Sequence, residues 1–238
     1  MKALAGNCDK SDLRCFLMAN SIKATFYFDY ISPYAYLMWR RLNDENREFS
    51  SRLDLRYRPV LFAGLLNHWG QKGPAEIEAK RVHTYRQVVY LAEKFGIPFS
   101  MPDTHPFNPL AALRLTIAAG NTPETINSIF DSIWVRGHRP DDPNGFSAIV
   151  EALAFEGGDS VAKEKIATAV VKQELLENGA DALAEKVFGV PTIIAQGELF
   201  WGVDSLDMLL HFLDNPDWYS DDEMSRIFSI VPSASRVL

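Results

Sequence analysis

The chain has 238 residues, of which 47% are hydrophobic, so it can bury a core for one large domain or two interlocked domains. Its formal net charge of −7 argues against a general affinity for nucleic acid or for an anionic membrane surface. An anionic small molecule would therefore have to be held by a few well-placed cations.

Residues 1–21 hold both cysteines of the chain, Cys8 and Cys15. Their spacing fits neither a Cys-x-x-Cys redox pair nor a zinc site, so we expect two unpaired thiols and no metal centre. Charged residues between positions 9 and 14 interrupt any signal-peptide core. No apolar run approaches the roughly 20 residues that cross a bilayer, and we expect a cytoplasmic protein.

The next segment predicts a β-α-β unit. Ile22–Phe28 is short, β-branched and aromatic, which is typical of a buried strand. Tyr36–Phe49 has helical periodicity, and before it Ser32 is a good N-cap and Pro33 a good first helical residue. Leu53–Pro59 alternates apolar and polar residues and predicts a second, half-buried strand.

Helical periodicity dominates from Leu61 to about Lys186, and breaks at glycine and proline divide it. The predicted helices are Ala75–Phe95, Pro109–Ala119, Pro123–Val135, Gly145–Phe155, Asp159–Asn178 and Ala180–Val187. The strand signal returns in a tight hairpin, Pro191–Ala195 and Leu199–Trp201. A last helix is predicted over Ser205–Leu213, and residues 215–238 are expected to be irregular.

Strand-containing ends thus flank a helical middle, which predicts the α/β class. One discontinuous domain would comprise residues 22–60 and 187–215, and a helical domain of residues 61–186 would be inserted between them. Residues 1–21 and 216–238 would form an N-terminal extension and a C-terminal tail.

The corner between the first strand and the first helix reads Asp29-Tyr30-Ile31-Ser32-Pro33-Tyr34-Ala35. In a thioredoxin-type redox fold this corner carries Cys-x-x-Cys, and the helix N-terminus stabilises a thiolate. Ser32 and Ala35 occupy the cysteine positions here, so the corner cannot form a disulfide. The Ser32 hydroxyl can instead donate a hydrogen bond to a bound anion, with plain helix capping as the alternative.

Two further motifs follow the helical middle. The Val190-Pro191 step precedes a strand and is a candidate cis peptide, with a trans proline as the alternative. The backbone N–H and C=O of Val190 could pair with an extended peptide ligand. At the last helix start, Asp204 and Ser205 either bind the charged groups of an amino-acid-like ligand or act as caps, and Trp201 is either a core residue or a flat wall.

Together these motifs resemble the 2-hydroxychromene-2-carboxylate isomerase family, which is related to kappa-class glutathione transferases and to bacterial disulfide oxidoreductases. The resemblance covers about residues 22–213, and residues 26–37, 186–192 and 199–204 carry it in the expected order. It implies a thioredoxin-like domain with an inserted all-helical domain, a homodimer, and glutathione as the cofactor.

The resemblance also implies residue roles. Ser32 would hold the glutathione thiol as a thiolate, and Val190 with Pro191 would pair with the glutathione backbone. Asp204 and Ser205 would hold the γ-glutamyl end, although close relatives often have an arginine where this chain has Ser205. That replacement removes a guanidinium that would otherwise bind the γ-glutamyl carboxylate.

The helical middle contributes further residues by resemblance. Residues 64–74 resemble the family's active-site loop, in which Gln71 stands where relatives often have asparagine. Lys80 matches a lysine six residues after the loop proline and would face a carboxylate of glutathione or substrate, with a solvated helix face as the alternative. The candidate substrate-binding residues are Tyr34, Asn67, Tyr85, Arg114 and Trp201.

The implied activity is the glutathione-dependent interconversion of 2-hydroxychromene-2-carboxylate and trans-o-hydroxybenzylidenepyruvate, in the catabolism of aromatic compounds. The partner would be a small aromatic carboxylate, with no nucleic acid and no membrane. Two alternatives stay open: a kappa-like glutathione transferase or peroxidase, and a catalytically inactive thioredoxin-like protein that binds a peptide.

Overall fold

A four-stranded mixed sheet with strand order β2-β1-β3-β4 forms the centre of the protein. The computed structural model describes residues 21–43 and 49–234, so Cys8 and Cys15 lie outside the described residues. β1 (Ile22–Phe28) runs parallel to β2 (Leu53–Pro59) and antiparallel to β3 (Thr192–Ala195), which pairs antiparallel with β4 (Glu198–Trp201). The two chain ends therefore build one sheet, which confirms the predicted α/β class.

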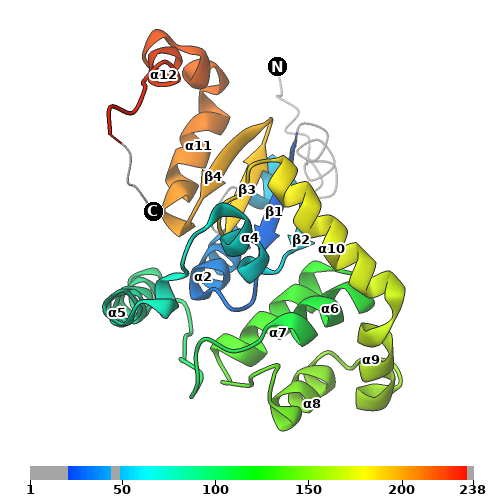
Figure 1. Cartoon of the computed structure of the whole chain (residues 1–238). Coiled ribbons are helices and arrows are strands. Elements are labelled where there is room, and N and C mark those ends of the chain that lie inside the picture. The colour runs from blue at the N-terminus through cyan, green and yellow to red at the C-terminus, as the bar shows by residue number, and fades with distance from the viewer. Residues whose placement is uncertain (1–20, 44–48, 235–238) are drawn as a thin grey trace, which may run out of the picture.

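Helices cover this sheet and fill the chain between β2 and β3 (Figure 1). The described α-helices are α2 (Pro33–Leu42), α3 (Phe49–Arg52), α4 (Phe62–Trp69), α5 (Glu78–Phe95), α6 (Leu110–Ala118), α7 (Pro123–Trp134), α8 (Pro143–Ala152), α9 (Gly158–Ala167), α10 (Ala169–Ala184), α11 (Leu206–Asp214) and α12 (Asp222–Ile227). Single turns of 3-10 helix are η1 (Pro74–Glu76), η2 (Val203–Ser205) and η3 (Pro216–Ser220). The exact domain boundaries stay a prediction.

Several predicted elements differ from those in the structure. The helix expected over Asp159–Asn178 is two helices, because Thr168 has an extended backbone conformation between α9 and α10. α10 then continues to Ala184, so the separate helix predicted over Ala180–Val187 is wrong. The first helix ends at Leu42, and residues 44–48 lie outside the described residues.

Two further helices stand where none was predicted. α4 is only two turns long and ends at Gly70, whose left-handed backbone (φ 62°) glycine adopts easily. A helix this short shows too few repeats of the hydrophobic pattern to be predicted from the sequence. α12 and η3 lie in the tail that was expected to be irregular, so that expectation is wrong for these residues. Helices of five or six residues are too short to show a clear helical periodicity in the sequence.

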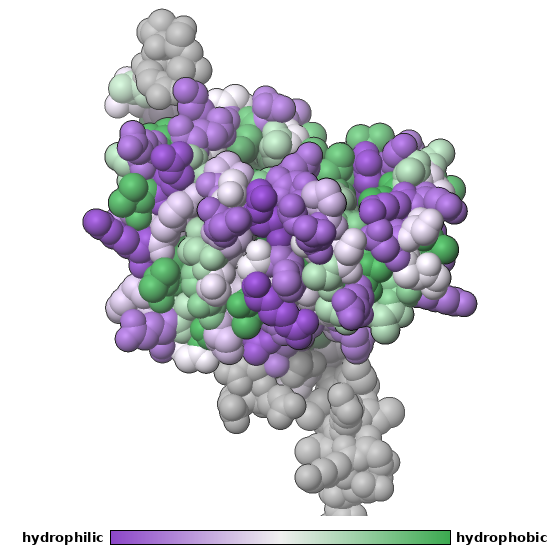
Figure 2. Space-filling view, turned by 90° about the horizontal axis from the view of Figure 1, so that it is seen from below, coloured by the Kyte–Doolittle hydropathy of each residue, from purple (hydrophilic) through white to green (hydrophobic). Residues whose placement is uncertain are grey.

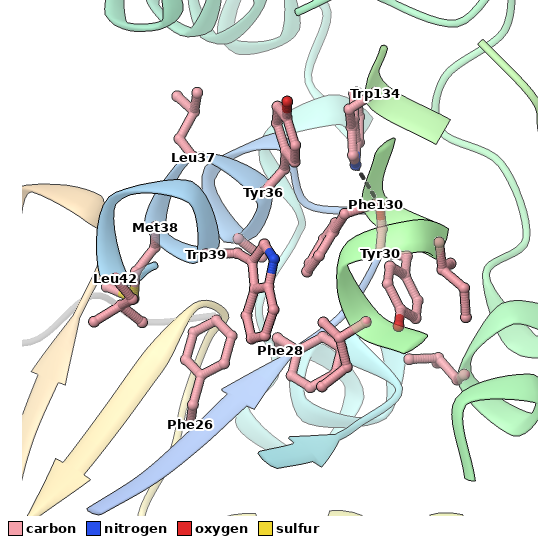
Figure 3. Packing of buried hydrophobic residues seen from close by; sticks show 14 of the residues in the cluster. Phe26, Phe28, Tyr30, Tyr36, Leu37, Met38, Trp39, Leu42, Phe130 and Trp134 are labelled. Carbon is pink, nitrogen blue, oxygen red and sulfur yellow. Dashed lines mark hydrogen bonds between the residues drawn. The ribbon is translucent and has the colours of Figure 1, made fainter. Parts of the chain in front are cut away.

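An aromatic core joins the sheet to the helical middle (Figure 3). The rings of Phe26 and Phe28 on β1 stack with centroids 5.3 Å apart, and Phe28 also meets Phe130 of α7 at 5.7 Å. Trp39 of α2 lies 6.2 Å from the same Phe130 ring. Because all these side chains are almost fully buried, α2 is fixed between the sheet and the helices below it.

Outside this core the surface is mainly polar. Seen from below, the side that carries the helical middle is largely hydrophilic, and hydrophobic side chains emerge only in small separate patches (Figure 2). This distribution agrees with the acidic composition of the chain, and it makes exposed apolar side chains the exception on this face.

The outer edge of β2 is closed by two asparagine side chains. Asn121 Nδ2 donates to the Tyr57 carbonyl at 2.7 Å, and Asn178 Nδ2 donates to the Pro59 carbonyl at 3.1 Å. Asn178 is buried and also accepts a hydrogen bond from the guanidinium of Arg58. Pro59 has no N–H to offer, so this edge is a poor template for another strand.

We expect Asn178→Ala to lower the free energy of unfolding by about 1–3 kcal/mol, because the buried Pro59 carbonyl and one Arg58 nitrogen lose their partner. Urea denaturation at neutral pH measures this loss. Gln173→Ala is the matched control, since Gln173 lies on the exposed face of the same helix. An equal loss in both variants would contradict the bridging role of Asn178.

Candidate active site

Ser32 stands at the N-terminus of α2, as the sequence predicts. Its side-chain oxygen accepts a hydrogen bond from the Ala35 N–H at 3.2 Å, so the serine caps the helix, and Pro33 is the first helical residue. The same hydroxyl donates to the Val190 carbonyl at 3.4 Å. This bond is long for an O–H···O contact, which is usually about 2.7–2.8 Å, so the proton is available to a better acceptor.

The Val190–Pro191 peptide bond is cis, the first of the two alternatives considered from the sequence. The Val190 carbonyl faces Ser32, and within the described ranges the Val190 N–H has no hydrogen-bond partner. The Pro191 carbonyl accepts from the Gly202 N–H at 2.9 Å. This bond joins the cis-proline loop to the start of the last helix.

The start of α11 carries no side-chain cap among the described residues. Ser205 donates its hydroxyl to the Gly202 carbonyl at 2.8 Å instead, so the expectation that Asp204 and Ser205 cap the helix is wrong. Gly202 has φ 85°, and a Cβ there would lie 2.5 Å from Asp204 Oδ1. The positive φ favours glycine at this turn, and the Asp204 carboxylate beside it is exposed.

Tyr34 faces this helix start from the first turn of α2. Burial raises the pKa of its hydroxyl, and the charge of Asp204 raises it further. The hydroxyl donates to Gln87 Oε1 of α5 at 2.5 Å. Tyr34 thus stays protonated near neutral pH and connects the Ser32 corner to α5.

Two exposed tryptophans border the same region. Trp201 is 51% exposed, which rules out the core alternative, and its ring meets Phe188 edge to face at 5.1 Å. A Cβ at Gly189 would come within 2.6 Å of Trp201 Nε1, so glycine lets the indole lie against the backbone. Trp69 of α4 is 40% exposed, and its Nε1 donates to the Val187 carbonyl at 3.0 Å. Sequence reasoning missed Trp69 and Phe188 as site residues, although both lie within or beside the motifs that it used.

Tyr85 lies behind the Ser32 corner. Its hydroxyl is 2.7 Å from His105 Nδ1, and His105 Nε2 lies 2.8 Å from the Ile31 carbonyl. Burial lowers the pKa of His105, so the neutral ring donates from Nε2 and accepts at Nδ1. Hydrogen bonds through His105 therefore connect Tyr85 to Ile31, the residue before Ser32.

The contacts of the other predicted site residues do not test the roles expected for them. Asn67, Gln71 and Lys80 are exposed, on α4, in the loop after it and on the first turns of α5. Arg114 is half-buried on α6, and its Nε is buried without a partner among the described residues. Among residues 21–43 and 49–234, no hydrogen bond or ion pair joins these four to Ser32 or Val190, and their roles stay predictions.

Asp29, at the end of β1, is a buried residue that sequence reasoning quoted but did not select. Its Oδ1 accepts from the Ile31 N–H at 3.1 Å, and its Oδ2 accepts from the Phe62 N–H at 2.8 Å. One carboxylate thus ties the Ser32 corner to the start of α4. Burial raises the pKa of Asp29 from 3.8 to about 7, while the backbone N–H donors act in the opposite direction.

Arg41 braces the opposite end of α2. Its side chain is buried, and its Nη atoms donate to the Val203 carbonyl at 3.0 Å and to Asp207 Oδ1 at 2.9 Å. The guanidinium lies 4.6 Å from the ring centroid of Phe95 at the end of α5. The helix that begins at Ser32 is therefore held against the turn that carries Asp204.

A family model of the DSBA-like thioredoxin domain matches residues 24–214. The chain belongs to this family. The match covers both halves of the sheet and the helical middle, so the thioredoxin-like fold with an inserted helical region is confirmed.

Curated relatives confirm the resemblance found in the sequence. The chain is 29% identical over 192 residues to a 2-hydroxychromene-2-carboxylate isomerase of Pseudomonas putida, an alignment that covers 77% of this chain and 90% of that protein. It is 26% identical over 202 residues to glutathione S-transferase kappa 1 of Rattus norvegicus, covering 79% and 88%. Both relatives are enzymes.

A solved 2-hydroxychromene-2-carboxylate isomerase superposes on this DSBA-like chain with a TM-score of 0.69. The match covers 85% of this chain and 99% of that one, at 24% identity, and shows the shared fold. In the described part of the chain no cluster of three or more histidine, cysteine or acidic residues is placed to hold a metal ion. None of the described helices is long and apolar enough to cross a membrane.

The raised pKa of Asp29 gives a testable effect of pH on stability. Between about pH 4 and 7 the folded protein keeps a proton on Asp29 that the unfolded chain releases, so this group makes the free energy of unfolding fall as the pH rises. We expect Asp29→Asn to make that slope less negative by up to about 1.4 kcal/mol per pH unit.

Urea denaturation between pH 4 and 8 measures the slope. Asp217→Asn is the control, because Asp217 is exposed. Identical slopes for wild type and Asp29→Asn would contradict the assigned protonation of Asp29.

Proposed function

We propose that the protein is a glutathione-dependent isomerase of the 2-hydroxychromene-2-carboxylate type, acting on a small aromatic carboxylate. The observation that carries this proposal is the Ser32 hydroxyl, which stands at the cysteine position and makes only a long hydrogen bond, with 3.4 Å between its oxygen and the Val190 carbonyl oxygen. A site with no sulfur of its own, but with the geometry that favours a thiolate, is suited to a thiol brought by a ligand.

The surrounding backbone fits glutathione. Its extended peptide can pair with the Val190 N–H, which no described residue uses. Its γ-glutamyl carboxylate can meet the N–H groups at the uncapped start of α11, and its ammonium can meet the exposed Asp204 carboxylate. The Ser205 hydroxyl is already bonded to the Gly202 carbonyl, so it acts by holding this turn.

When bound, glutathione would supply a thiolate for reversible addition to a conjugated enone, the chemistry that a cis–trans isomerisation of this type needs. Ser32 contributes by donating a hydrogen bond to the sulfur, while keeping its proton, in place of its bond to the Val190 carbonyl. The N-terminal end of α2 favours negative charge at the same place. Both effects keep the sulfur ionised near neutral pH.

The substrate would lie beside the exposed aromatic residues. Trp201 is held by Phe188 and by the close approach of Gly189, so it offers a fixed flat surface to an aromatic ring. We assign Lys80 to the substrate or glycyl carboxylate, because it is an exposed cation near the start of α5. Tyr34 donates its hydroxyl proton to Gln87, so its oxygen can accept a hydrogen bond from a hydroxyl group of the substrate.

Ser32→Ala is expected to lower kcat/KM at neutral pH about 100-fold, the usual cost of losing one hydrogen-bond donor to a reacting anion. The KM for glutathione should change little, because the Val190 loop and α11 bind the peptide. Initial rates at varied glutathione measure both constants, with Ser229→Ala, an exposed serine, as the control. Undiminished turnover with glutathione still bound would show that Ser32 lacks the assigned role.

The kappa-transferase relative favours a second candidate, glutathione conjugation or peroxide reduction at the same site. Both reactions need the same thiolate, so only substrates distinguish them. Assays with 2-hydroxychromene-2-carboxylate, with a small electrophile and with an organic hydroperoxide should be run in parallel. The isomerase proposal requires the first substrate to have the highest kcat/KM.

A catalytically inactive peptide-binding protein is the remaining alternative, and glutathione binding distinguishes it. Glutathione at 100 times its Kd should stabilise the wild-type protein by about 2.7 kcal/mol and raise its Tm. Asp204→Asn should reduce this shift, because the ammonium of glutathione loses its counter-ion, whereas Asp217→Asn should not. A wild-type protein that glutathione neither stabilises nor retains on an affinity column would overturn the proposal.

The physiological setting rests on the same resemblance. A role in the catabolism of aromatic compounds and a cytoplasmic location stay predictions, and so does the homodimer.

A further inference from the structure

Hydrogen bonds join the two ends of α4 to the two halves of the candidate site. At the start of the helix, the Phe62 N–H donates to Asp29 Oδ2 at 2.8 Å, and Asp29 lies three residues before Ser32. At its end, Trp69 Nε1 donates to the Val187 carbonyl at 3.0 Å. A helix of eight residues is about 12 Å long, so α4 bridges the Ser32 corner and the cis-proline loop over about that length.

The cis-proline loop, residues 187–191, packs against the same face of α4 that carries Trp69. Leu65 is 2% exposed and belongs to one buried cluster with Val187 and Val190. Residues four apart lie on the same face of a helix, so Trp69 follows Leu65 by one turn on this face. α4 therefore holds the loop in two ways, with an apolar side chain and with an indole N–H.

The bond from Trp69 differs in kind from most of the bonds that hold the cis-proline loop. Local hydrogen bonds join the loop to the chain that flanks it, at Ala182, Thr192 and Gly202. Among the described residues, two further bonds come from distant segments: Ser32 reaches one loop carbonyl at 3.4 Å, and Trp69 reaches another at 3.0 Å. The shorter of the two is closer to ordinary hydrogen-bond geometry, so Trp69 is the firmer distant attachment of the loop.

We propose that Trp69 is a positioning residue for glutathione, whose indole N–H fixes the place of the cis-proline loop and so of the Val190 N–H that pairs with the ligand peptide. The inference rests on the proposed function, which supplies the ligand. Trp69 acts through the Val187 carbonyl and does not have to touch glutathione. Because this carbonyl and the Val190 N–H belong to one short loop, displacement of the first also displaces the second, and the pairing with an extended peptide weakens.

Trp69 can be replaced without removing a core side chain. It is 40% exposed, and its described ring contact is with His68, edge to face at 5.1 Å. A smaller aromatic ring at this position loses the N–H and leaves the buried Leu65 in place. The effect of the N–H on ligand binding can therefore be measured in a folded protein.

Isothermal titration calorimetry of the full chain with two ligands tests this role. The ligands are glutathione and S-methylglutathione, which keeps the peptide backbone and both charged ends but has no ionisable thiol. We expect Trp69→Phe to raise the Kd of both ligands by a similar factor, about three- to tenfold, the usual effect of losing one hydrogen bond. An equal change for the two ligands assigns the effect to the peptide backbone and not to the thiolate at Ser32.

A second replacement separates the N–H from the ring. Phenylalanine keeps an aromatic ring without the N–H and leucine keeps neither, so Trp69→Leu should give the same Kd values as Trp69→Phe. Trp218→Phe is the matched control, because it makes the same change in η3, beyond the far end of α11, where the indole N–H has no hydrogen-bond partner among the described residues. It should leave both Kd values unchanged, and circular dichroism melting curves check the fold of every variant.

Two results would overturn this inference. One is an unchanged Kd of S-methylglutathione in Trp69→Phe, and the other is an increase confined to Trp69→Leu, since the ring itself would then touch the ligand. The proposed function fails by a different result. A wild-type protein that binds both ligands, with the expected pattern in the variants, but does not convert 2-hydroxychromene-2-carboxylate would contradict the isomerase alone.

Discussion

The arrangement of the site depends on the close approach of the Ser32 corner to the Val190 loop, 158 residues apart in the chain, which the hydrogen bond from the Ser32 hydroxyl to the Val190 carbonyl marks. Ser32 lies in the corner between β1 and α2, as the N-cap of α2, and Val190 stands in the cis-proline loop before β3. Because β1 and β3 pair directly in the sheet, the two segments meet at the same sheet end. The bond is long, and the backbone around it, rather than its own strength, keeps the groups together.

That backbone is held by buried polar contacts on three sides. Asp29 ties the corner to α4, His105 supports the carbonyl of the preceding residue, and Arg41 binds the far end of α2 to the turn before α11. Each contact comes from a different part of the chain. A change in the helical middle can therefore alter the position of Ser32 without touching it. The same arrangement links α5, through Gln87 and Tyr34, to the Ser32 corner.

The sequence predicted the parts of this structure that depend on local pattern. The buried strand before Ser32, the cap and proline at the start of α2, and the hairpin of β3 and β4 each follow from short-range signals. The grouping of Ser32, Val190 and the Asp204 turn came from motif resemblance, since no local pattern shows which loops meet. The division of Asp159–Asn178 at Thr168 was missed because a single extended residue leaves little trace in helical periodicity.

The contacts that support the site could not be predicted, for a related reason. Asp29 looks like a turn residue in sequence, and only its full burial and its bond to the distant Phe62 N–H show its role. Trp69 likewise lies in a stretch that appeared to be a loop. The capping expectation for Asp204 and Ser205 failed because the Gly202 turn redirects the Ser205 hydroxyl toward a backbone carbonyl.

The central claim is that this corner stabilises a thiolate that the chain does not itself provide. The most direct test is the pKa of the glutathione thiol in the complex, measured from the ultraviolet absorbance of the thiolate as the pH is varied. The account predicts a pKa at least about one unit below that of free glutathione, since a donated hydrogen bond and a helix N-terminus both favour the charged form. A thiol that titrates in the complex as it does free in solution would contradict it.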